Sequence, residues 1–246
     1  MIKLEPHGKT AVVRLDNKTA NAVNLNLLEE LAETLETVKN QYHAMVLAGN
    51  PRFFSMGFDL PELILLDRNG FSEFFQKFNE TVISILTLPV PTVAALGGHT
   101  IAGGAILALA CDFRVGKEGK PLIGLNEIKL GLPVPFIADL MLRQVTGDRT
   151  ATRMIFQGEF VSMAEAAGSG LVDRVAENEG VEAGALEMAA DLARLSGPAM
   201  EACKAIRTRD ITRAYDAYGT LENERLIDCW QNPKTRELLK EAAEKF

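Results

Sequence analysis

The sequence predicts an α/β fold, with strands and helices alternating over the first ~180 residues and helices alone after them. Short apolar runs that end in Gly, Pro or Asn indicate strands, and 44–48 is the clearest of them. Longer stretches with apolar residues at helical spacing lie between these runs and fill the C-terminal part. Such alternation is typical of a mostly parallel sheet system whose faces are covered by helices.

The N-terminal elements follow from local patterns. Residues 2–4 and 11–15 carry apolar side chains on either side of a His-Gly-Lys turn, which predicts a strand pair. Asn24 is expected to cap a helix that continues to about Lys39, because leucines recur there at helical spacing. The next elements expected are a buried strand at 44–48, a loop at 52–59, a helix at 71–86 and a buried strand at 92–96.

The stretch 102–110 is small and apolar on every side, which is typical of a fully buried helix. Short strands are expected at 113–115 and 122–125, before a helix that Pro133 and Pro135 open and that continues to about Val145. Beyond this point the strand signal nearly disappears. The helices expected there are 149–156, 162–167, 184–195, 198–210, 214–230 and 233–245.

Composition restricts the classes of function. Of the 246 residues, 47% are hydrophobic and 24% charged, as in an ordinary globular protein that can bury a sizeable core. The net charge of −7 and the lack of a Lys/Arg run argue against nucleic-acid binding. The apolar stretches are too short to cross a membrane. Three dispersed cysteines and an N-terminus without targeting features lead us to expect a cytoplasmic protein without a metal site.

Two glycine-containing turns precede helical patterns. The first, FFSMGFDL at 53–60, places Gly57 after an apolar pair and Asp59 near the start of the next helix, which alone indicates only a turn. The second, GGHTIAGGA at 97–105, has four glycines just before the buried helix. They could let a ligand approach backbone N–H groups at the helix N-terminus, or merely let two elements pack tightly. Neither a dinucleotide fingerprint nor a P-loop is present.

A third segment carries an acid. Glu127 lies between apolar residues at the end of the strand expected at 122–125. Burial in apolar surroundings raises the pKa of a carboxyl group toward the range of a useful general base. A surface glutamate on a loop is the alternative that the local sequence leaves open.

Together these segments resemble the crotonase superfamily, also called the enoyl-CoA hydratase/isomerase family. Its Phe-Ser-x-Gly-x-Asp-Leu loop corresponds to 54–60, and its Gly-x-x-x-x-Gly-Gly helix entry with a later Cys-Asp corresponds to 98–104 and 111–112. Its glutamate, followed by Leu-Gly and Pro, corresponds to Glu127, 130–131 and Pro133. Weaker likenesses at 21–23, 162–166 and 170–173 extend the resemblance over most of the chain.

The resemblance implies an oxyanion hole of two backbone N–H groups, those of Phe58 and Gly103, for the thioester oxygen. Such a donor is commonly worth about 3–4 kcal/mol of barrier. Because both donors are backbone groups, the identity of the Phe58 side chain is expected not to matter to the chemistry. Coenzyme A is expected along Met56, Gly57, Phe58, Asp59 and Leu60, with Lys18 as a candidate for phosphate contact.

One family position is missing its acid. The hydratases of the family use a second glutamate three residues after the oxyanion-hole glycine, where this chain has Ile106. A single base, Glu127, could move a proton from C2 to C4 of a 3-enoyl-CoA, as in the Δ3-Δ2-enoyl-CoA isomerase branch. Ile106, Leu130 and Phe136 are then expected to exclude water. Asn126 is expected to position the acyl chain or the base.

The same resemblance implies the wider organisation. The fold would be a crotonase-like spiral of ββα units at 1–190 with a C-terminal helical region at 191–246, assembled as a homotrimer or a dimer of trimers. The expected partner is an acyl-CoA substrate, with no cofactor beyond its coenzyme A, no metal, no nucleic acid and no membrane. A hydratase or another crotonase reaction, or a non-catalytic CoA-binding protein, are the alternatives.

Overall fold

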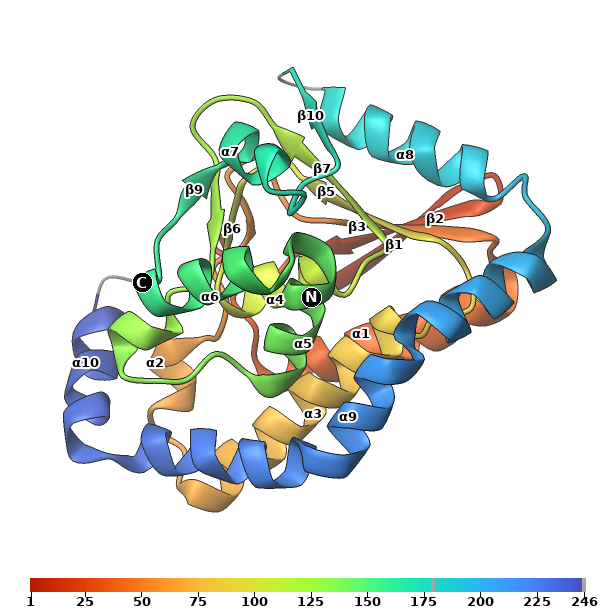
Figure 1. Ribbon diagram of the computed structural model, residues 1–246. Helices are drawn as coiled ribbons and strands as arrows, with labels where there is room; N and C mark the ends of the chain where they lie inside the picture. The colour runs from red at the N-terminus through yellow and green to blue at the C-terminus, as the bar shows by residue number, and fades with distance from the viewer. Residues whose placement is uncertain (178–179, 245–246) are drawn as a thin grey trace.

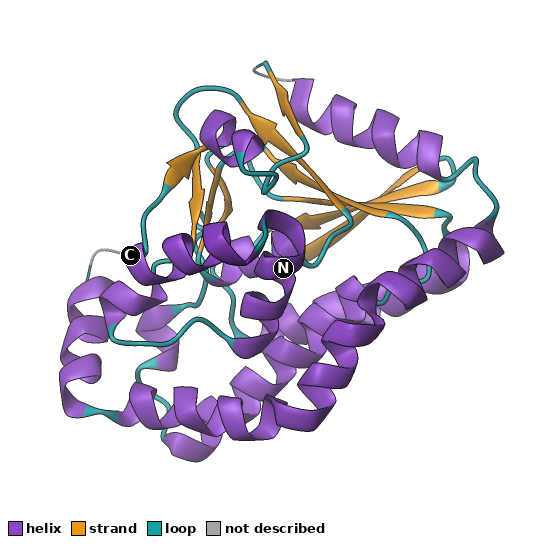
Figure 2. Ribbon diagram, in the orientation of Figure 1, coloured by secondary structure: helices purple, strands orange, loops and turns teal. Residues whose placement is uncertain are grey.

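The computed structural model describes residues 1–177 and 180–244, in which two β-sheets are flanked by helices (Figure 1, Figure 2). The larger sheet has six strands in the order β1-β2-β3-β5-β7-β10. Only the β1–β2 hairpin is antiparallel within it. Its strands are β1 (Ile2–His7), β2 (Thr10–Leu15), β3 (Ala44–Ala48), β5 (Thr92–Leu96), β7 (Phe113–Lys117) and β10 (Arg174–Ala176).

Helices cover both faces of this sheet, which explains why β3 and β5 are buried along their whole length. On one face, Val46 and Val93 pack with Ala185 of α8 (Gly180–Leu192). On the other face lies the main core, to which α1 (Leu25–Gln41) and α3 (Arg68–Leu86) contribute. The α/β architecture predicted from the sequence is therefore confirmed.

The smaller sheet has the strand order β4-β6-β8-β9, and its first three strands run parallel. These strands are β4 (Phe53–Ser55), β6 (His99–Ile101), β8 (Leu122–Gly124) and β9 (Val161–Ser162). The three parallel strands lead into α2 (Leu60–Leu63), α4 (Gly103–Leu109) and the 3-10 helix η1 (Glu127–Leu130). Parallel neighbours end at the same edge of a sheet, so the segments that follow them meet there.

The remaining helices are α5 (Phe136–Thr146), α6 (Asp148–Gln157), α7 (Met163–Gly168), α9 (Gly197–Gln231) and α10 (Pro233–Ala243). Helix α9 runs along α3 and returns the chain to the end of the molecule that holds α2 and α10 (Figure 1). Leu226, Ile227, Trp230 and Leu239 from α9 and α10 belong to the main core. The Trp230 ring stacks on Phe71 at a centroid distance of 3.8 Å.

The structure corrects some predicted boundaries. The two helices expected at 198–210 and 214–230 are one continuous 35-residue helix, α9. The intervening Ile211-Thr212-Arg213 contains no Gly or Pro to end a helix, and Ile211 is buried. Four strands of two or three residues (β4, β6, β9, β10) were not expected, because such lengths carry almost no periodic signal. Of the last predicted helix, Lys245 lies outside the described residues.

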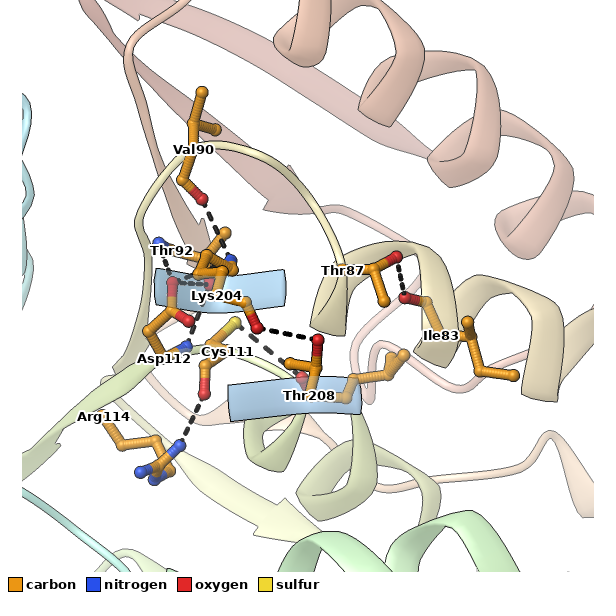
Figure 3. A network of polar contacts seen from close by, with 10 residues as sticks. Ile83, Thr87, Val90, Thr92, Cys111, Asp112, Arg114, Lys204 and Thr208 are labelled. Atoms are coloured by element: carbon orange, nitrogen blue, oxygen red, sulfur yellow. Dashed lines mark hydrogen bonds and ion pairs between the residues drawn. The ribbon is translucent and has the colours of Figure 1, made fainter. Parts of the chain in front are cut away.

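A polar network connects the N-terminal part of α9 with the segments at the starts of β5 and β7 (Figure 3). The Lys204 ammonium donates hydrogen bonds to Asp112 at 2.8 Å and to the Val90 carbonyl at 3.0 Å. Asp112 also accepts from the backbone N–H of Thr92.

None of the described helices combines the length and the apolar character that a membrane span needs.

Candidate active site

The edge where β4, β6 and β8 end opens into a cavity of ≈ 370 Å³. The three following segments supply one wall, with Phe58, Gly103 and Glu127 in it. The opposite wall comes from α9 and α10, through Leu226, Trp230, Leu238, Glu241 and Ala242. Most of the lining is apolar, with few polar groups, as is usual for a small-molecule site.

Among the described residues, Glu127 is the only acid on the strand-edge wall of this cavity, while Glu241 lies on the α10 wall. The Glu127 residue is 7% exposed, and its Oε2 atom has no hydrogen-bond partner among the described residues. Burial raises the pKa of Glu127 from 4.5 to about 7, since the charged form loses its hydration. A carboxyl group with this pKa can both accept and return a proton near neutral pH.

Two backbone N–H groups without acceptors in the described part of the chain indicate an oxyanion hole. No described residue accepts a hydrogen bond from the N–H of Phe58 or of Gly103. Gly103 is the first residue of α4, so its N–H has no acceptor within the helix and lies at the positive end of the helix dipole. The neighbours of Phe58 hold the other donor in place: Val23 N–H donates to the Gly57 carbonyl at 2.7 Å, and Asp59 N–H donates to Val23 at 2.9 Å.

Unusual backbone conformations bring the two donors together. Gly57 has φ +86°, and Ala102 has φ +48° and ψ −121°. Residues other than glycine rarely adopt backbone conformations with positive φ. A Cβ atom at Gly57 would lie 2.9 Å from the Gly103 nitrogen. A Cβ atom at Gly104 would lie 2.5 Å from the Ser55 carbonyl oxygen. The adjacent glycines thus differ: Gly104 permits tight packing of α4 on β4, and Gly103 supplies the free N–H.

Seven of the residues proposed from the sequence line this cavity: Met56, Phe58, Leu60, Gly103, Asn126, Glu127 and Leu130. Gly57 lies behind them against Gly103. Asp59 is buried, and its Oδ2 atom lies 3.6 Å from the Lys18 ammonium. Lys18 itself is 76% exposed and does not reach the cavity wall.

Two of the residues expected to exclude water do not line this cavity in the structure. Ile106 is completely buried in the core and does not line the cavity, because α4 turns that side chain inward. Phe136, the first residue of α5, is also outside the lining. Apolar lining comes instead from Ile101, the last residue of β6, and from three residues that come after η1, Leu132, Pro133 and Pro135.

Sequence reasoning missed the wall from the C-terminal helices. Leu226, Trp230 and Leu238 are about a hundred residues from Glu127 along the chain, and their spacing signals only helical packing. Phe160, just before β9, also lines the cavity and was not predicted. The described residues contain no group of three or more His, Cys, Asp or Glu side chains that could hold a metal ion.

A second cavity, of ≈ 420 Å³, lies between α9, α5 and β7. Four of its charged side chains form pairs, Lys204 with Asp112 and Arg114 with Asp173. Cys111 also lines it, and burial raises the pKa of this thiol to about 12, which leaves it unreactive as a nucleophile. The arrangement has the character of a structural network rather than a catalytic one.

Comparison with known proteins agrees with this geometry. Residues 5–246 match the family model described as enoyl-CoA hydratase/isomerase. The chain is 33% identical over 185 residues to mouse mitochondrial enoyl-CoA delta isomerase 1, covering 74% of this chain and 64% of the mouse protein. The human protein of the same name is 30% identical over 210 residues, covering 84% of this chain and 70% of the human one.

The fold agrees as well. The crystal structure of human mitochondrial delta3-delta2-enoyl-CoA isomerase superposes with a TM-score of 0.95 at 26% identity, covering 99% of this chain and 97% of that one. The family match spans almost the whole sequence, and both walls of the cavity lie within it. The chain is therefore a member of the enoyl-CoA hydratase/isomerase family of enzymes and has the crotonase fold.

Proposed function

We propose that this enzyme shifts the double bond of a 3-enoyl-CoA to give the 2-enoyl-CoA, with Glu127 as the only proton-transfer group. The observation that carries the proposal is a single buried carboxyl group in a mostly apolar cavity that also contains two free backbone N–H groups. A water-activating pair of acids would need a second carboxylate on α4, where Ile106 is buried in the core.

The thioester carbonyl would accept hydrogen bonds from the N–H groups of Phe58 and Gly103. Glu127 would remove a proton from C2, which the thioester and the β,γ double bond make acidic. The negative charge of the resulting dienolate would rest on the oxygen in the oxyanion hole. The carboxylic acid formed on Glu127 would then protonate C4, so that the same group ends the cycle ionised.

The raised pKa of Glu127 supports this cycle. A carboxyl group with a pKa of about 7 is a stronger base than an exposed glutamate, and it loses its proton again readily once C4 is in reach. The apolar walls formed by Leu130, Leu132 and Ile101 would keep water from the dienolate. Asn126, directly before Glu127, lines the same cavity and would position the acyl chain or the base.

Coenzyme A would enter along Met56 and Leu60, which line the cavity on the β4–α2 side. The exposed Lys18 lies beside this loop through its ion pair with Asp59 and would meet a phosphate group. No cofactor besides the coenzyme A of the substrate is needed for this reaction. We further propose a cytoplasmic protein that assembles as a homotrimer or a dimer of trimers, as the resemblance implies.

The test uses purified protein with 3-hexenoyl-CoA and, separately, 2-hexenoyl-CoA, each beside a Glu127→Gln variant. Absorbance of the conjugated thioester reports both the isomerisation and the hydration of the double bond. We expect conversion of the 3-enoyl substrate, negligible hydration of the 2-enoyl one and a loss of at least about 1000-fold in kcat for the variant. Rapid hydration by the unmodified protein would show instead that a second base operates.

A further inference from the structure

We propose that the aromatic ring of Phe58 is a positioning element that sets the separation of the two oxyanion-hole donors. The inference rests on the proposed oxyanion hole, but not on the double-bond shift itself. It replaces the expectation that only the backbone of Phe58 matters. The reason lies in what touches each side of the ring.

One side of the Phe58 ring lies against Gly103. A Cβ atom built at Gly103 would lie 3.0 Å from Cδ1 and 3.1 Å from Cε1 of Phe58. The ring therefore fills the space in which a side chain at position 103 would begin. Because Gly103 carries the second donor, the ring connects the residues that hold the two N–H groups.

The other side of the ring lies against α3. Phe58 meets Phe74 and Phe78 edge to face, with centroid distances of 4.9 Å and interplanar angles of 86° and 87°. Both partners are buried in the main core. The ring is thus held between a rigid helix and the first residue of α4, and it cannot move toward α3 to let Gly103 approach.

The two donors belong to separate segments, the β4–α2 loop and the start of α4, so their separation depends on packing between those segments. Gly57 lies directly against the Gly103 nitrogen, and this contact limits how closely the two segments can approach. The Phe58 ring, held against α3, limits the movement of Gly103 toward that helix. Donors bind the developing oxyanion well only within about 2.7–3.1 Å, so a small displacement weakens charge stabilisation more than it weakens ground-state binding.

The experiment compares Phe58→Leu with the unmodified enzyme in two measurements. Infrared difference spectroscopy of bound 2-hexenoyl-CoA, labelled with ¹³C at the carbonyl, reports the polarisation of the C=O bond without turnover. Steady-state kinetics with 3-hexenoyl-CoA report kcat and KM. We expect the variant to lose most of the downward shift of the carbonyl band and about 10- to 100-fold in kcat, with KM changed by less than about threefold.

Phe160→Leu is the matched control, because Phe160 also lines the cavity but packs on Gly124. This change is expected to alter KM and to leave the carbonyl band in its original position. Phe74→Leu removes part of the support behind the Phe58 ring and should produce a smaller band displacement in the same direction as Phe58→Leu. It carries the test if Phe58→Leu does not fold.

An unchanged carbonyl band in a folded Phe58→Leu protein, or a change in KM alone, would overturn the proposal. An unmodified protein that shifts the band but does not isomerise 3-hexenoyl-CoA would contradict the proposed function and leave the positioning role standing. A protein that binds 2-hexenoyl-CoA without any band shift would contradict both.

Discussion

The Lys204 ammonium lies 2.8 Å from the carboxylate of Asp112 (Figure 3). This ion pair connects α9 with the segment between α4 and β7, to which Asp112 belongs. Lys204 is 5% exposed, and its ammonium group also donates a hydrogen bond to the Val90 carbonyl. Asp112 in turn accepts from the backbone and the hydroxyl of Thr92. The network thus holds together α9, the start of β5 and the far end of the helix that begins with the Gly103 donor.

Removing this lysine should destabilise the protein. In Lys204→Met, Asp112 keeps its bonds to Thr92 but loses its counter-charge, and the Val90 carbonyl loses its donor. We expect a loss of about 2 kcal/mol in the free energy of unfolding, measured by denaturant titration. As a control, Arg194→Ala breaks a pair with Asp191 in which both side chains are largely exposed, and should cost less than about 0.5 kcal/mol. Equal effects of the two changes would contradict the structural role of the network.

The pH dependence of activity should follow Glu127. The base must be ionised, and burial raises its pKa to about 7, so kcat/KM should rise with pH to a plateau above about 7. A pH profile with 3-hexenoyl-CoA measures this directly. An acidic limb with its midpoint below pH 5 would mean that the carboxyl group is not buried in the working enzyme.

Stability should show the opposite trend. The pKa of Glu127 is higher in the folded than in the unfolded chain, so folding favours the protonated form. This contribution is fully present below the unfolded value of about 4.5 and is lost as pH rises through about 7. Between these values Glu127→Gln should lose less stability with rising pH than the unmodified protein, in parallel denaturant titrations. If the unfolding free energies of the two proteins changed equally with pH, the raised pKa of Glu127 would be contradicted.

Gly57→Ala should impair catalysis as well as stability. The position has φ +86°, and the new Cβ would lie 2.9 Å from the Gly103 nitrogen, so one oxyanion donor must move. We expect kcat to fall by at least about 10-fold. Gly119→Ala is the matched control, since Gly119 has φ +97° but open space around it. The Gly119→Ala variant should lose about 1 kcal/mol in the free energy of unfolding, and its kcat should be unchanged.

Placing an acid at position 106 should not create a hydratase. Ile106 is fully buried, so Ile106→Glu would put an unpaired carboxyl group where the structure buries an apolar side chain. We expect a loss of about 3 kcal/mol or more in unfolding free energy and no hydration of 2-hexenoyl-CoA. Ile106→Val, which keeps the core apolar, should cost about 1 kcal/mol. A stable Ile106→Glu protein that hydrates the substrate would contradict the observed burial of this side chain.

The local sequence determined most of the elements of this protein. The leucines after Asn24 predicted α1 and its cap, and the Asn24 side chain does accept from the Leu27 N–H. The apolar runs at 44–48 and 92–96 predicted β3 and β5 without error in their bounds. These signals are reliable because helical and extended periodicity is written in neighbouring residues. The ordered motifs around Gly57, Gly103 and Glu127 likewise indicated the family that the comparisons show.

Only the tertiary structure decided which side chains share the cavity. The sequence assigned Ile106 to its wall, whereas the direction of α4 turns that residue into the core, and Trp230 from a distant helix lines the cavity instead. The contact of the Phe58 ring with Gly103 and the pairing of Lys204 with Asp112 also join segments that are remote along the chain. Their positions depend on how whole elements pack, and packing between distant elements leaves no periodic trace in a single sequence.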